Sequence, residues 1–150
     1  MKPHSDFEEF LQLLEDQEVE YVIVGGYAVA FHGYPRFTKD LDVFFFNHPD
    51  NIQRLRKALL RFGFEENSIT EEILSHHGNI ITFGLEPMRI DLMNEIDGVD
   101  FKEASENVTR GHYGSTSVPF IGKEALLKNK KATPRLRDQS DAEELERLGE

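Results

Sequence analysis

The sequence has no cysteine, a shortage of positive charge and no long hydrophobic run. Without cysteine, the 150-residue chain cannot form disulfides, use a thiol nucleophile or bind zinc through thiolates, and it fits a reducing compartment. No apolar run approaches the roughly 20 residues of a membrane-spanning helix, so we expect a soluble, cytoplasmic protein with no membrane partner. A hydrophobic content of 39% with twelve phenylalanines suffices for one core, which predicts a single domain over residues 1–150.

Basic residues are few, and the charged residues are unevenly distributed along the chain. Lysine and arginine number 17 against 28 acidic residues, giving a net charge of −11, which disfavours a partner as anionic as a nucleic acid. However, one short stretch near the C-terminus is basic, so a local surface for phosphates remains open. This stretch contains Lys123, Lys128, Lys130, Lys131, Arg135 and Arg137.

Two aspartates interrupt an otherwise apolar strand. Asp40 and Asp42 precede Phe44, Phe45 and Phe46, so they open a buried strand, whereas most Asp-x-Asp triplets are solvated acids in turns or at strand ends. Positions i and i+2 lie on one strand face about 6.6 Å apart, where like charges are destabilising. A hard divalent cation such as Mg²⁺ would neutralise them.

Hydrophobic periodicity predicts alternating helices and strands around this pair. Residues 84–87 separate two alternating runs, as in a β-hairpin, and Asp91 lies on the polar face of the second run, opposite Ile90 and Leu92. Residues 63–77 indicate only a loop and a helical turn. Helices are predicted at 6–17, 27–31, 49–62, 100–107, 122–131 and 135–148, and strands at 21–24, 40–46, 79–83, 88–93 and 115–120.

The order of a strand, Gly25-Gly26, a short helix, the Asp-x-Asp strand and a later strand with a lone aspartate resembles the DNA polymerase beta-like nucleotidyltransferase superfamily. Two blocks are similar to small bacterial abortive-infection nucleotidyltransferases of the AbiEii type, and the resemblance spans roughly Val22 to Leu145 except residues 63–77. It implies a minimal nucleotidyltransferase fold of the α/β (α+β) class, a small mixed sheet flanked by helices, with C-terminal helices. The blocks are Val24–Val29 with His32-Gly33, Arg36, Thr38 and Asp40–Asp42, and Lys131-Ala132 with Arg135, Arg137-Asp138 and Asp141.

The resemblance also implies a metal-dependent reaction. Asp40, Asp42 and Asp91 would hold Mg²⁺, or alternatively Mn²⁺, against a nucleoside triphosphate (NTP), and Asp91 would accept the proton of an acceptor hydroxyl. The reaction would transfer a nucleoside monophosphate (NMP) and release pyrophosphate. The AbiEii type implies RNA, such as a tRNA 3′ end, as acceptor, with growth arrest as the outcome and a cognate antitoxin as a partner. Other branches modify proteins or antibiotics.

The loops around the two aspartates supply candidates for phosphate binding. Gly25 and Gly26 have no Cβ that would block a phosphate. Arg36 suits a phosphate because a guanidinium can donate two parallel hydrogen bonds. Lys39 lies in the same loop and is equally well explained as a solvated charge.

The remaining candidates depend on which way a helix faces. Lys128 and Lys131 share one side of a predicted helix and would hold the triphosphate if that side lines the cleft. Tyr27 stands where the superfamily commonly has serine; it could stack on a base, but packing beneath the helix is favoured. Asp138 and Asp141 are expected to pair with nearby arginines or to cap the last helix.

Two other interpretations remain open. The first is a non-catalytic nucleotide-binding or antitoxin-like module that acts through a protein partner, and the second is an acidic α/β domain with a chance Asp-x-Asp triplet. The presence of three acids favours the enzyme, because without a metal clustered carboxylates only cost stability.

Overall fold

The centre of the fold is a six-stranded mixed sheet with the strand order β3-β4-β2-β1-β6-β5. The computed structural model describes residues 5–34, 38–84 and 89–148. Neighbouring strands run antiparallel except β2 with β4 and β1 with β6, which are parallel. The predicted α/β class with a small mixed sheet is therefore confirmed. The strands are β1 (Tyr21–Val24), β2 (Asp40–Phe45), β3 (Ile80–Phe83), β4 (Arg89–Met93), β5 (Thr109–Tyr113) and β6 (Thr116–Phe120).

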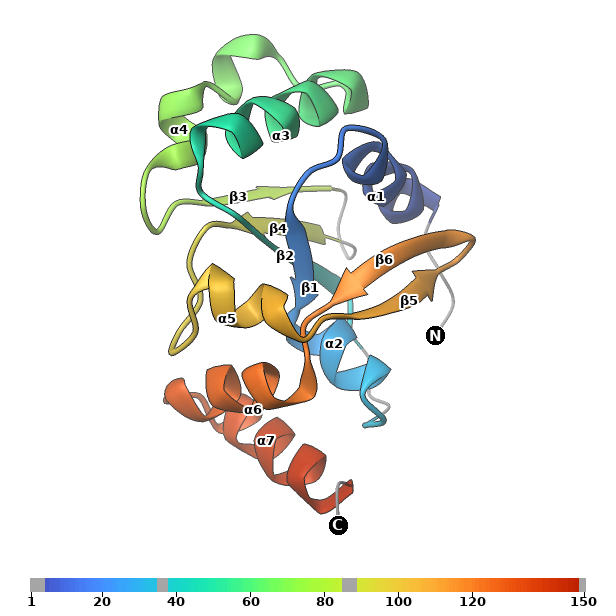
Figure 1. Ribbon diagram of the computed structural model, residues 1–150, viewed down its shortest axis with the longest axis vertical. Helices are drawn as coiled ribbons and strands as arrows, with labels where there is room; N and C mark the ends of the chain where they lie inside the picture. Colours follow the sequence, from blue (N-terminus) through green and yellow to red (C-terminus); the bar gives the residue numbers. More distant parts are fainter. Residues whose placement is uncertain (1–4, 35–37, 85–88, 149–150) are drawn as a thin grey trace.

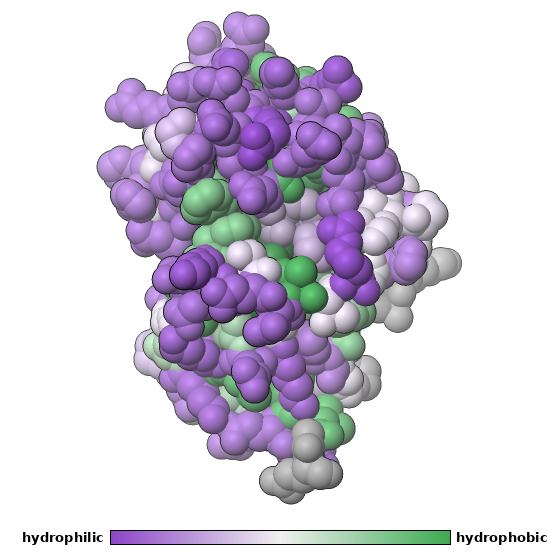
Figure 2. Space-filling view, viewed as in Figure 1, coloured by the Kyte–Doolittle hydropathy of each residue, from purple (hydrophilic) through white to green (hydrophobic). Residues whose placement is uncertain are grey.

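Helices cover the sheet in two separate groups. Helices α1 and α3 pack on each other at one end, and α6 and α7 pack side by side at the opposite end (Figure 1). None of the helices formed by the described residues is long and apolar enough to cross a membrane. Most of the face in Figure 2 is hydrophilic. The helices are α1 (Ser5–Asp16), α2 (Gly25–Phe31), α3 (Pro49–Phe62), α4 (Glu71–Ser75), α5 (Phe101–Glu106), α6 (Lys123–Ala132) and α7 (Leu136–Leu148), with a 3₁₀ turn at Glu66–Ser68.

The long amphipathic helices form where the periodicity predicts them. In α1 the buried residues keep helical spacing, and the ring of Phe10 packs edge-on against Phe62 of α3 and Phe83 of β3, with centroids 5.4 and 5.2 Å apart. Helix α3 begins at Pro49, where the missing N–H is no loss, and ends before Gly63, whose φ of 121° stops the helix.

The predicted elements differ from the observed ones by more than one residue at two places. Strand β5 was not predicted, because its residues are mostly exposed and show no apolar alternation; its pairing with β6 makes it a strand. Helix α2 begins at Gly25, two residues earlier than predicted, because Gly25 adopts a φ of 67° and turns the chain directly from β1 into the helix. The predicted hairpin turn at 84–87 lies mostly outside the described residues.

A buried asparagine joins the strand that carries the acids to its neighbour. Asn51 of α3 is 0% exposed; its Oδ1 accepts from the Glu20 N–H at 2.7 Å, and its Nδ2 donates to the carbonyls of Glu20 and Phe46 at 3.0 and 2.8 Å. One side chain thus satisfies backbone groups at the start of β1 and the end of β2.

Replacing Asn51 should therefore weaken the whole sheet. We expect Asn51→Ala to lower the free energy of unfolding by about 2–4 kcal/mol, because a fully buried side chain and its three part-buried hydrogen bonds to the backbone are lost. Urea unfolding followed by circular dichroism measures this. Gln53→Ala, at an exposed position of the same helix, is the matched control and should change stability by less than about 0.5 kcal/mol. An equal effect of both substitutions would contradict the role given to Asn51.

Candidate active site

Three aspartates converge on one cleft because of the pairing between β2 and β4. The parallel register places Asp42 beside Asp91 and Asp40 beside Arg89. In both strands the alternate residues are buried on the opposite side, so all three acids share one face of the sheet. They line a cleft of about 400 Å³, within the roughly 300–1,000 Å³ typical of small-molecule sites. The three acids that the resemblance assigns to one cation therefore line the same cleft.

Gly25 is required by the carboxylate that it faces. It directly follows Val24, which pairs with Asp42 across the two strands. A Cβ built on Gly25 would lie 2.1 Å from Oδ2 of Asp42, and the φ of 67° is itself unfavourable for other residues. Gly25 and Gly26 both line the cleft, as predicted. The reason for the first glycine is different, since its missing side chain makes room for an acid of the protein.

The clustered acids perturb one another. Burial, followed by the charges of Asp91 and Asp40 and by a hydrogen bond with the Asp91 carboxyl, raises the pKa of Asp42 from 3.8 to about 7. The charge of Lys130 acts in the opposite direction. Asp42 therefore holds its proton over part of the neutral range when no cation is bound.

Arg89 balances part of this negative charge. Its Nη2 lies 2.9 Å from Oδ2 of Asp40, and its Nε lies 3.3 Å from Oδ1 of Asp91. Thr82 of β3 adds a hydrogen bond to Oδ1 of Asp91 at 2.8 Å. The sequence contained a signal for Arg89, because it shares a strand face with Asp91, but its role as a bridge between two strands follows only from their register.

The donor set of this cluster fits a hard cation. Within the described part of the chain, no group of three acidic or histidine side chains is arranged to hold a metal ion as it stands, since Arg89 lies between Asp40 and Asp91. Nevertheless, three carboxylates on one wall offer the oxygen ligands that Mg²⁺ and Mn²⁺ prefer. Burial is the largest cause of the raised pKa of Asp42, but the charges of Asp91 and Asp40 also contribute, so Arg89 leaves their negative charge incompletely balanced.

The opposite wall of the cleft is basic and comes from the α6–α7 corner. Lys130, Thr133, Arg135 and Arg137 line it. Lys130 is 5% exposed and lies on the buried side of α6, one turn after the buried Leu126. This i, i+4 relation to a core residue was the signal that sequence reasoning missed.

The two lysines that the sequence favoured lie elsewhere. Lys128 pairs with Glu103 and Lys131 with Glu146, each at 2.6 Å, and neither lines the cleft. Their expected contact with the triphosphate conflicts with the orientation of α6, since Lys130, between them in sequence, faces the cleft instead. The pairing expected for Asp138 is observed, because Arg135 Nε lies 2.9 Å from its Oδ2.

The remaining candidates for nucleotide binding are also placed outside the cleft or left undescribed. Tyr27 is 5% exposed and packs edge-on against Tyr113 and Phe7, with ring centroids 5.7 and 6.4 Å away, so it is a core residue as favoured and does not stack on a base. Lys39 is exposed and does not line the cleft, whereas the neighbouring Thr38 does. Arg36 lies outside the described residues.

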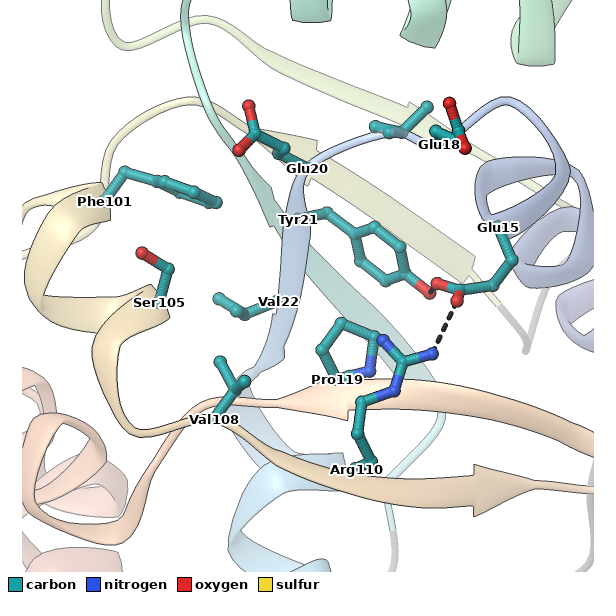
Figure 3. A pocket seen from close by; sticks show the side chains of 11 residues that line it. Glu15, Glu18, Glu20, Tyr21, Val22, Phe101, Ser105, Val108, Arg110 and Pro119 are labelled. Atoms are coloured by element: carbon teal, nitrogen blue, oxygen red, sulfur yellow. Dashed lines mark hydrogen bonds and ion pairs between the residues drawn. The ribbon is translucent and has the colours of Figure 1, made fainter.

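A second cavity, of about 330 Å³, lies between β1, α5 and the β5–β6 hairpin (Figure 3). Its central polar groups are occupied with one another. Arg110 Nη2 lies 2.6 Å from Oε1 of Glu15, and the Tyr21 hydroxyl donates to Oε2 of Glu15 at 2.7 Å. Burial and this hydrogen bond raise the pKa of Tyr21, which keeps its proton. These contacts indicate a structural junction.

Comparison with known proteins gives a family match over nearly the whole chain. Residues 4–150 match the family described as "Nucleotidyl transferase of unknown function (DUF2204)". No relative was found among curated protein sequences. The match covers nearly the whole chain, including both walls of the cleft.

Solved structures with a similar fold are distant in sequence. The lincosamide antibiotic adenylyltransferase LnuA, in its lincomycin-bound form, is 19% identical, with a TM-score of 0.55 over 97% of each chain. An antigenic nucleotidyltransferase-like protein from Paracoccidioides brasiliensis is 17% identical, with a TM-score of 0.61 over 98% of this chain and 78% of that one. ANT(2")-Ia in complex with adenylyl-2"-tobramycin is 16% identical, with a TM-score of 0.55 over 95% and 91%. At these identities the similarity shows a shared fold.

The pKa of Asp42 predicts how stability changes with pH. The folded protein keeps the Asp42 proton up to about pH 7, whereas the unfolded chain loses it near pH 3.8, so the metal-free protein loses stability as the pH rises through this window. We expect Asp42→Asn to be about 1–2 kcal/mol more stable than the wild type at pH 8 and equally stable near pH 4. Denaturant unfolding in EDTA at several pH values measures this, with the exposed Asp16→Asn as control. A pH-independent difference would argue against the assigned titration.

The close approach at Gly25 predicts a second effect. We expect Gly25→Ala to displace the Asp42 carboxylate and to destabilise the fold by about 2–3 kcal/mol, combining a strained φ with a steric clash. Gly63→Ala is the matched control, because Gly63 also has a positive φ, of 121°, but no atom lies within 4 Å of the added Cβ. Thermal unfolding of both variants separates the cost of the strained φ from the cost of the steric clash. Equal destabilisation would show that the clash with Asp42 is unimportant.

Proposed function

Because the chain belongs to the nucleotidyltransferase family DUF2204, we propose that it transfers an NMP from an NTP to an acceptor hydroxyl and releases pyrophosphate. One observation carries this proposal: the in-register pairing of β2 with β4 brings Asp40, Asp42 and Asp91 to one wall of a cleft. The facing wall supplies Lys130, Arg135 and Arg137. Carboxylates for a cation and basic groups for phosphates thus meet across one space of suitable size.

Each wall has a distinct task in this reaction. Asp40, Asp42 and Asp91 would hold Mg²⁺ or Mn²⁺, which when bound neutralises the phosphates and polarises the α-phosphate. Asp42 must lose its proton to serve as a ligand, so cation binding should strengthen as the pH rises toward 7. Asp91 would accept the proton of the attacking hydroxyl. The basic wall and the Gly25-Gly26 turn would bind the triphosphate.

For the acceptor we propose RNA, such as a tRNA 3′ end, on the strength of the AbiEii-type resemblance. A cognate antitoxin and a role in growth arrest or phage defence belong to the same proposal. A small hydroxyl compound is a second candidate, favoured by the net charge of −11, which opposes long anionic partners, and by the apolar residues Ile80, Met93 and Ile96 in the cleft. The antibiotic-modifying neighbours in the fold comparison act on acceptors of that kind.

A transfer assay tests the reaction. Incubation with each radiolabelled NTP and Mg²⁺ should label total RNA or, in parallel reactions, a hydroxyl-bearing small molecule. We expect Asp91→Asn to reduce transfer by about 100-fold or more, because it removes both a cation ligand and the proton acceptor. Asp16→Asn, an exposed acid on α1, should leave transfer unchanged.

The same proteins distinguish the proposed function from the alternatives. No transfer with any of the four NTPs to either acceptor class would favour the non-catalytic nucleotide-binding module. Growth arrest by the wild-type chain but not by Asp91→Asn would support the toxin role. Arrest by both would separate toxicity from catalysis.

A further inference from the structure

One buried carboxylate organises the basic wall of the cleft. Asp138, in the first turn of α7, is 3% exposed and accepts hydrogen bonds from three donors. Lys130 Nζ donates to its Oδ1 at 2.7 Å, while Thr133 Oγ1 and Arg135 Nε donate to its Oδ2 at 2.7 and 2.9 Å. The three donors come from the end of α6 and the connection to α7, so a single side chain sets the geometry of the whole corner.

Asp138, Lys130 and Arg135 form a cluster in which the charges are paired. Burial alone would raise the pKa of Asp138, but hydrogen bonds from Lys130 and Thr133, together with the charges of Lys130 and Arg135, lower it below its usual value. Asp141 adds a second contact to Lys130, at 3.3 Å. Buried charges persist only when they are paired and hydrogen-bonded, so Lys130 has little freedom to move.

Arg135 is anchored at one end only. Its Nε is bound to a nearly inaccessible carboxylate, while its side chain is 78% exposed. It lines the cleft together with Lys130 and Asp138. A guanidinium held through Nε presents its terminal nitrogens in a fixed orientation, and this planar fork matches the oxygens of a phosphate. Preorganisation of this kind increases affinity, because less side-chain entropy is lost on binding.

We propose that Asp138 is a positioning residue that presents Lys130 and Arg135 as a preformed binding surface for the triphosphate of the NTP. This inference rests on the proposed function, since it assigns the triphosphate to the basic wall of the same cleft. Asp138 does not touch the phosphates; it acts through Lys130 and Arg135.

The effect of removing the Asp138 charge on phosphate binding distinguishes positioning from simple electrostatic repulsion. An acid close to an anion-binding surface weakens binding, so removing its charge should tighten the binding of phosphates. If Asp138 positions the two basic groups, removing its charge should weaken binding instead. A purely structural joint between α6 and α7 would change the melting temperature and leave affinity unaltered.

The probe is inorganic tripolyphosphate, which has the charge of the triphosphate and requires neither a base nor an acceptor. Isothermal titration calorimetry with Mg²⁺ should give dissociation constants about 10-fold higher for Asp138→Asn and for Arg135→Ala than for the wild type. Arg135→Lys keeps the charge but lacks the anchored fork, so we expect a loss of several-fold. Glu143→Gln, an exposed acid of α7, is the matched control and should bind like the wild type.

Each outcome decides the proposal. Unchanged or tighter binding by a folded Asp138→Asn protein overturns it, as does a wild-type protein that does not bind tripolyphosphate. If Asp138→Asn fails to fold, unchanged binding by Arg135→Ala, altered at an exposed side chain, overturns it equally. The double variant should lose less than the product of the two single losses, because both act through the same guanidinium.

Failure of the enzyme proposal is recognised separately. Binding of tripolyphosphate needs no turnover, so a protein that shows the expected affinities but transfers no NMP refutes the proposed reaction and leaves the role of Asp138 intact. A wild-type protein that transfers an NMP, together with unaltered affinity in the variants, refutes the role of Asp138 and leaves the proposed reaction intact.

Discussion

Three carboxylates on a single face of the sheet impose the electrostatic constraint around which the cleft is arranged. Parallel pairing of β2 with β4 brings Asp40, Asp42 and Asp91 together, and antiparallel pairing of β1 with β2 places the residue before Gly25 opposite Asp42. Neighbouring like charges are unfavourable, and three features of the site reduce this cost. Asp42 has a raised pKa, Arg89 bridges the other two acids, and Gly25 lacks the side chain that would collide with Asp42.

The facing wall of the cleft carries the opposite, positive charge. Helices α6 and α7 meet at a corner where Lys130 is buried against Asp138 and Asp141, and Arg135 extends from the same junction. The charge of Lys130 is felt by Asp42, so the two walls interact across the cleft. A cation and a polyphosphate entering together would complement the acidic and the basic wall at once. The buried ion cluster is therefore better understood as an aid to placing charges than as a source of stability.

Much of the scaffold was predictable from local patterns. The apolar faces of α1 and α3, the buried strand β1 and the alternation in β4 each follow from a period that the chain repeats. Strand β5 was missed because an exposed edge strand has no such period, and it forms only through its partner β6. Lys128 and Lys131 were chosen in place of Lys130 because charge density does not show which side of a helix is buried.

Local patterns in the sequence were enough to predict most of the helices and strands and the acidic part of the cleft: a Gly-Gly turn, an Asp-x-Asp strand and a third aspartate on the polar face of another strand. These features are local, since spacing along a helix or strand dictates which residues share a face. Three contacts became visible only in the folded chain: Asp42 lies beside Asp91, Arg89 bridges two strands, and Asp138 binds Lys130 and Arg135. Register between strands and packing between helices bring together residues far apart in the chain, and no local period specifies them.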